Sequence, residues 1–171
     1  MDESGKLLPQ AEEILQIMSG SGCVLGTGHL SPQETFALID RANEIGGIQV
    51  LVTHPEWGPT FHSVAQQKAL AARGNVMFER CFVSTTHRCG FVPFETIEEA
   101  IAGTGVENTV LSTDLGQPDT PPPVEGLRAY ADRLRSTGFS VDDIRRMIQT
   151  NPARLLSQPA TRARRTDTAG S

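Results

Sequence analysis

Three segments of the sequence share one pattern, and each ends in a side chain that can bind a metal ion. They are VLGTGH (24–29), VLVTH (50–54) and VLSTD (110–114). The last residues of these segments are His29, His54 and Asp114, and two imidazoles with one carboxylate suit zinc, iron or manganese. Taken singly, a His or Asp after a strand is more often a loop or turn residue. The threefold recurrence favours a shared metal site, with a turn or bulge to absorb the extra residue before His29.

The segments before these side chains have the length and apolar character of buried strands. Capping signals such as Ser31-Pro32-Gln33-Glu34 and Ser140–Asp143 mark the starts of helices between and after the strands. Asn151-Pro152 is expected to break the last long helix and start a short one. The sequence thus predicts strands at 23–27, 48–52, 76–82 and 109–113, and helices at 10–18, 32–45, 63–73, 95–102, 124–136 and 140–150.

Strands that alternate with helices predict an α/β fold with a parallel sheet. Such a sheet is either doubly wound or part of a barrel, and in both folds ligands bind at the carboxyl ends of the strands. A closed eight-stranded barrel typically needs about 250 residues. Four strand–helix units in 171 residues supply half of one.

Composition and charge narrow the range of partners. The net charge is −5. Residues 1–124 contain 6 basic and 15 acidic side chains, whereas residues 125–171 contain 9 basic and 5 acidic ones. The arginines mostly alternate with acids at helical spacing, so we expect no nucleic-acid partner. No membrane-spanning run or signal peptide is visible, and three cysteines fit a reducing compartment, which together predict a cytoplasmic protein without a membrane partner. We expect one domain over 1–157 and a disordered polar tail over 158–171.

Several motifs occur together in an order that resembles a known superfamily. They are Gly28-His29 followed by Ser31–Glu34, then Val52–Pro55, Leu111–Asp114, and the helical ending Ile144–Leu156. Over about residues 5–157 the chain resembles the second half of the metal-dependent amidohydrolase superfamily, most closely its DUF6282-like branch.

The resemblance implies a fold and a reaction. It places His29, His54 and Asp114 after barrel strands five, six and eight. The two histidines would bind a divalent metal, zinc most readily and manganese or iron as alternatives. Asp114 would contact the metal or its water and act as general base, since a metal lowers the pKa of bound water toward about 7. The implied substrate is a small molecule with an amide, ester or lactone-type bond.

The sequence also departs from this superfamily, which carries a His-x-His pair on its first strand. No such pair occurs here, so we expect the C-terminal half of a TIM-type (β/α)8 barrel, four βα units plus C-terminal helices, in a truncated protein. Three interpretations stay open: a hydrolase, a non-catalytic remnant, and a subunit that completes its barrel with a second copy or a separate N-terminal half. Glu79 is either a strand-end salt bridge, which we favour, or a partner of the metal ligands. Trp57 and Phe61 either wall a substrate pocket or cover the barrel top.

Overall fold

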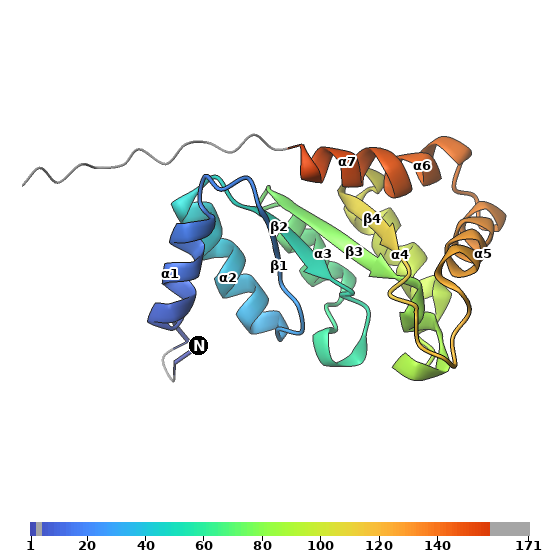
Figure 1. Ribbon diagram of the computed structural model, residues 1–171, viewed down its shortest axis with the longest axis horizontal. Helices are drawn as coiled ribbons and strands as arrows, with labels where there is room; N and C mark the ends of the chain where they lie inside the picture. The colour runs from blue at the N-terminus through green and yellow to red at the C-terminus, as the bar shows by residue number, and fades with distance from the viewer. Residues whose placement is uncertain (3–4, 158–171) are drawn as a thin grey trace, which may run out of the picture.

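Four parallel strands form one sheet in the order β1-β2-β3-β4 (Figure 1). The strands are β1 (Val24–Gly26), β2 (Gln49–Thr53), β3 (Val76–Cys81) and β4 (Thr109–Ser112). This computed structural model describes residues 1–2 and 5–157, so the expected disordered tail at 158–171 lies outside the described residues. The α/β class, the parallel sheet and all four strands predicted from the sequence are confirmed.

The helices begin where the sequence places its capping signals. Ser31 accepts a hydrogen bond from the Glu34 N–H, and the Glu34 carboxylate accepts one from the Ser31 N–H, which closes the predicted capping box. Ser63 and Ser140 open their helices in the same way. The helices are α1 (Pro9–Met18), α2 (Pro32–Ile45), α3 (Val64–Ala71), α4 (Phe94–Thr104), α5 (Pro123–Ser136), α6 (Val141–Arg145) and α7 (Asn151–Leu156). None of the helices in the described part of the chain is both long and apolar enough to cross a membrane.

The expected start of a short helix at Asn151 is confirmed, but the expected break before it is wrong. A π-helical turn over Arg146–Thr150 carries the chain from α6 into α7 while the backbone stays helical. Pro152 lies in the first turn of α7, where its missing N–H is tolerated. Asn151 is buried, and its side-chain amide donates hydrogen bonds of 2.7 and 2.6 Å to the carbonyls of Val106 and Thr109. These bonds fasten the helix to the start of β4.

The strand order decides between the two α/β folds that the sequence left open. A right-handed crossover between each strand and the next in a consecutive order places the crossover helices on one face of the sheet. A doubly wound sheet reverses its order and carries helices on both faces. The order β1-β2-β3-β4 is therefore that of four successive βα units of a TIM-type barrel.

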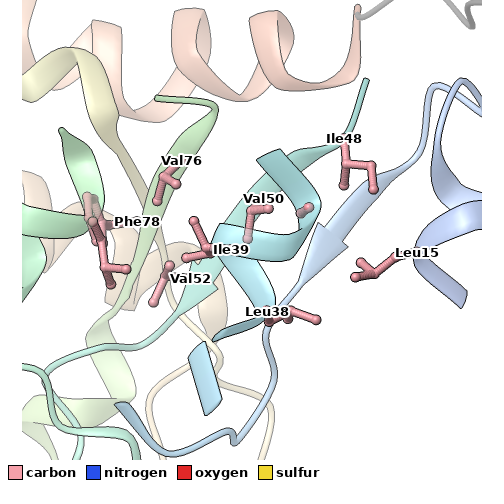
Figure 2. Close-up of a cluster of buried hydrophobic side chains, with 10 residues drawn as sticks. Leu15, Leu38, Ile39, Ile48, Val50, Val52, Val76 and Phe78 are labelled. Carbon is pink, nitrogen blue, oxygen red and sulfur yellow. The ribbon is translucent and has the colours of Figure 1, made fainter. Parts of the chain in front are cut away.

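The helix-covered face of the sheet contains the main apolar core. Val50 and Val52 of β2 and Val76 and Phe78 of β3 pack against α2 and α3 (Figure 2). Leu15 of α1 joins the same cluster. A second cluster joins α4, α5 and the α6 region to Leu111 of β4. Helices α1 to α6 thus pack on one side of the sheet.

The opposite face of the sheet changes character along the strands. Near the strand starts, Met77 and Val110 pack against Leu155 of α7, which lies across that end of the sheet (Figure 1). Toward the carboxyl ends the same face turns polar, and its side chains are Thr53, Glu79, Cys81 and Ser112. Thr53 is in register with Glu79, and Cys81 with Ser112. We call this polar half the open face, because helices pack only on the apolar half.

Candidate functional site

The three predicted site residues follow strands that end in the same backbone conformation. Gly28, His54 and Asp114 each come directly after a threonine and have positive φ angles of 56°, 28° and 51°. Residues with a Cβ rarely adopt this left-handed region, although Asp, Asn and His tolerate it better than most. Gly28 occupies the position that His54 and Asp114 occupy in their segments. The glycine thus makes the turn that the extra residue before His29 required.

His29 and His54 come together with Trp57. The ring centroids of the two histidines are 5.0 Å apart, and each lies 5.1 Å from the indole ring. His54 is buried, whereas His29 is exposed on the loop after β1. The structure thus brings two of the three predicted ligands into contact and adds an aromatic wall beside them.

The hydrogen bonds of Thr60 fix the tautomer of His54. The Thr60 hydroxyl donates its proton toward the carbonyls of His54, at 2.9 Å, and Trp57, at 3.3 Å. It can therefore only accept at its 3.3 Å contact with Nδ1 of His54, so that Nδ1 carries the proton. Nε2 is left with a free lone pair, the form in which imidazole binds a metal ion. Burial, helped by the neighbouring His29, lowers the pKa of His54 and keeps the ring neutral at pH 7.

Two adjacent cavities meet at His29, His54 and Asp114. The inner cavity, of about 400 Å³, is lined by these three residues with Thr53, Glu79, Cys81, Ser112 and Thr113. The outer cavity, of about 310 Å³, is lined by the same three with Trp57, Val83, Ser84, Arg88, Cys89 and Gln117. The predicted site residues therefore form the boundary between an acidic chamber on the open face and a chamber near the loop surface.

The inner cavity corrects the favoured interpretation of Glu79. Among the described residues Glu79 makes no ion pair, and its side chain lines the cavity with Asp114. The strand-end salt bridge is therefore wrong. Cys81 lines the same cavity, but burial raises the pKa of its thiol to about 12, so it is protonated at neutral pH and is a poor nucleophile. The two carboxylates and the free Nε2 of His54 remain as the bases of this chamber.

The metal site itself is not preformed. Two imidazoles and a carboxylate around one boundary have the donor chemistry that divalent transition metals prefer. Within the described residues, however, no three His, Cys, Asp or Glu side chains are arranged so that they could hold an ion. Binding a metal therefore requires movement of these side chains. Exposed loop positions such as those of His29 and Asp114 permit that movement more readily than buried ones.

A buried ion pair that the sequence analysis missed holds the loop of His54 in place. Glu56 lies two residues after His54 and pairs with Arg80 of β3, and their side chains are 1% and 0% exposed. Gln67 bridges them, since it accepts from Arg80 at 2.9 Å and donates to Glu56 at 3.3 Å. Thr104 accepts a further 2.9 Å bond from Arg80. An arginine in a central strand was the available signal, because a buried arginine needs an acidic partner.

The two aromatic residues of this loop have different roles. Trp57 lines the outer cavity, in agreement with the interpretation of a pocket wall. Phe61 is 47% exposed and is absent from the lining of both cavities. Trp57 therefore lines a cavity beside the histidines, whereas Phe61 lines neither cavity.

Comparison with known proteins gives one match. A model of a family of unknown function, DUF6282, matches residues 1–79, which run from α1 into β3. The matched part contains His29 and His54, and Asp114 lies beyond it. No curated protein and no solved structure matches the chain.

Acidification is expected to destabilise the fold through two buried histidines. Burial lowers the pKa of His54 and of His62, so the unfolded chain takes up protons at a higher pH than the folded chain. Stability is therefore full above the unfolded value of 6.5 and falls as the pH drops through the lowered folded values. Urea unfolding at pH 7.5 and 5.5 measures the loss. The variant His62→Gln is expected to lose less than the wild type, and an equal loss would contradict the assignment.

Proposed function

We propose that this protein is a metal-dependent hydrolase that acts on an amide, ester or lactone-type bond of a small molecule. The observation that carries the proposal is His54: a buried, neutral imidazole with a free Nε2, next to His29 and on the cavity boundary that Asp114 shares. The site lies at the carboxyl ends of parallel strands, where α/β enzymes bind their ligands. The amidohydrolase resemblance supports the same chemistry.

In this proposal His29, His54 and Asp114 have different roles in hydrolysis. His29 and His54 would hold the ion through ring nitrogens, with Asp114 as the oxygen ligand or as the group nearest the attacking water. A bound divalent ion supplies the Lewis acidity that makes water nucleophilic at neutral pH. Asp114 would accept a proton from the attacking water and pass it to the leaving group. Thr60 would keep the proton of His54 on Nδ1 and its Nε2 free, and Trp57 packs against both imidazole rings.

Metal content tests the proposal. We expect the protein, incubated with zinc, manganese or iron(II) and then desalted, to retain about one ion per chain by elemental analysis. His54→Asn is expected to retain far less, and asparagine tolerates the positive φ at this position. His87→Asn is the matched control, since His87 is exposed, pairs with Asp119 and lines neither cavity. Retention at background level in the wild type would contradict the proposal and favour a non-catalytic remnant.

The free edges of the sheet favour a second candidate, a subunit whose strands pair with those of a second copy of this chain. Among the described strands, β1 and β4 each have one neighbour, so each leaves one row of backbone groups unpaired. The open face carries partly exposed polar side chains such as those of Thr53 and Ser112. A second four-stranded sheet would pair with the free edges of β1 and β4 and cover the open face.

Self-association is the expected result of these free edges. We expect sedimentation velocity to show dimers or larger species at micromolar concentration, because paired edge strands satisfy the free backbone groups. A monodisperse monomer at this concentration would rule out the second candidate. The hydrolase proposal does not depend on this result.

A further inference from the structure

The outer cavity differs from the inner one in the charge and polarity of its walls. The inner cavity has two carboxylates, those of Glu79 and Asp114, and no arginine or lysine. The outer cavity shares Asp114 with the inner one, but it adds the apolar surfaces of Trp57 and Val83, and Arg88 is the sole arginine or lysine that lines either cavity. A ligand that spans the boundary would therefore place its reacting bond near the histidines and an anionic, partly apolar portion in the outer cavity.

Ser84 provides an independent sign of a missing ligand. The residue is fully buried and lines the outer cavity, yet its hydroxyl has no hydrogen-bond partner among the described residues. A buried hydroxyl without a partner is costly, and such groups are usually satisfied by water or a bound ligand. Ser84 and Arg88 belong to the same loop after β3, so one acceptor group between them could receive bonds from both.

Arg88 already binds a carboxylate in the free protein. Its Nη1 atom lies 2.8 and 3.1 Å from the two carboxylate oxygens of Asp119. Nε2 of His87 lies 2.9 Å from one of the same oxygens. Both Arg88 and Asp119 are about half exposed, and exposed ion pairs of this kind contribute little to stability. Arg88 can therefore exchange Asp119 for the carboxylate of a ligand at small cost.

We propose that the outer cavity binds a carboxylate through Arg88 and Ser84, with the apolar body of the ligand against Trp57. This inference rests on the proposed function, and it names the substrate class: an amide or ester that carries a free carboxylate group. Arginine recognises the planar carboxylate through paired N–H donors, and the Ser84 hydroxyl donates to one of its oxygens. While no substrate is bound, the guanidinium of Arg88 pairs with the carboxylate of Asp119.

The single tryptophan of the chain, Trp57, reports directly on this cavity. Sodium benzoate is titrated into the metal-free, full-length protein while Trp57 fluorescence is followed. Benzamide has the same shape without the charge, and phenyl phosphate offers the alternative anion. We expect benzoate to change the fluorescence saturably, with benzamide and phenyl phosphate binding at least tenfold more weakly. Equal binding of benzamide, or tighter binding of phenyl phosphate, would overturn the carboxylate assignment.

Three variants and a control locate the binding groups. Arg88→Met is expected to weaken benzoate binding by about tenfold or more, and Ser84→Ala by several-fold. Asp119→Asn is expected to tighten binding, because it removes the competing carboxylate. If Arg88 merely tethered the loop, Asp119→Asn would weaken binding instead, and this outcome contradicts the proposal. Arg145→Met, at an exposed arginine paired with Asp142 far from both cavities, should leave binding unchanged.

The titration separates this proposal from the hydrolase proposal. Benzoate binding in a protein that retains no zinc, manganese or iron supports the carboxylate site and contradicts metal-dependent hydrolysis. Retention of metal without benzoate binding contradicts the carboxylate site and leaves the hydrolase standing. Unchanged benzoate affinity in Arg88→Met, with circular dichroism showing a folded protein, overturns the assignment of Arg88.

Discussion

Replacing Glu56 by glutamine is expected to lower the free energy of unfolding by about 3–5 kcal/mol, the usual cost of breaking a buried ion pair. Glutamine keeps the size of the side chain and removes its charge. The guanidinium of Arg80, whose side chain is 0% exposed, then remains in the core without a countercharge. Because the loss comes from the buried charge, it should exceed that of any substitution at an exposed ion pair of this protein.

Urea unfolding followed by circular dichroism measures this effect. The double variant Glu56→Leu with Arg80→Met removes both charges, and it should cost less than the sum of the two single substitutions. Asp142→Asn breaks the exposed pair with Arg145 and should leave the midpoint unchanged. A Glu56→Gln variant as stable as the wild type would show that Gln67 and Thr104 alone satisfy Arg80.

The loop of His54 gives the same substitution a second consequence. Glu56 is two residues from His54, and its ion pair connects the loop to β3. Loss of this ion pair should therefore disturb the ring contacts of His54 with His29 and Trp57. Trp57 fluorescence should then shift toward that of a solvent-exposed indole even at urea concentrations where the variant is folded. An unchanged emission maximum would show that Thr60 and the strand hold the loop without Glu56.

The second large effect is expected at Asp114. Asp114→Asn should lower metal-dependent ester hydrolysis by about 10²- to 10⁴-fold, the usual contribution of a positioned general base. Asparagine keeps the shape of the side chain and tolerates the φ of 51° found here, so the loop is expected to keep its conformation. The amide cannot accept the proton of the attacking water, which is why the rate and not the fold should change.

Hydrolysis of p-nitrophenyl acetate by zinc-loaded protein measures this prediction. Glu79→Gln is the informative comparison, because Glu79 is the other carboxylate of the inner cavity. If Glu79→Gln lowers the rate more than Asp114→Asn does, the general base is Glu79 and the assignment of Asp114 is wrong. Asp142→Asn, on the surface of α6, serves as the control for the removal of a carboxylate elsewhere.

Much of the local structure was predictable because its causes lie within a few residues. The capping boxes at Ser31 and Ser140 and the apolar runs of the four strands placed most elements close to their observed bounds. The predictions that failed concern residues whose conformation or contacts depend on segments distant in the sequence. Asn151 looked like a helix break, yet its side chain is held by the carbonyls of Val106 and Thr109 across 45 and 42 residues. Glu79 looked like one half of a strand-end salt bridge, yet it lines a cavity.

The candidate site divides in the same way. The repeated Val-Leu-x-Thr pattern was enough to predict that His29, His54 and Asp114 lie at strand ends, because strand length and turn chemistry are local properties. Their side chains border the same cavities. The tautomer of His54 depends on Thr60, and the outer cavity on the loop of Ser84 and Arg88. Neither follows from a spacing, since each depends on how a loop folds back on the strands.

By itself, then, the sequence determined the α/β class, the alternation of strands and helices, and the residue types available for chemistry. Only the tertiary structure decided that the strands run in consecutive order, that Arg80 and Glu56 pair beneath the site, and that two cavities of different charge meet at the histidines. The physical reason is the separation along the chain of the residues that interact. Capping, turns and hydrophobic periodicity act between neighbours along the chain, whereas strand order, buried charge pairs and cavities arise between segments that meet only on folding.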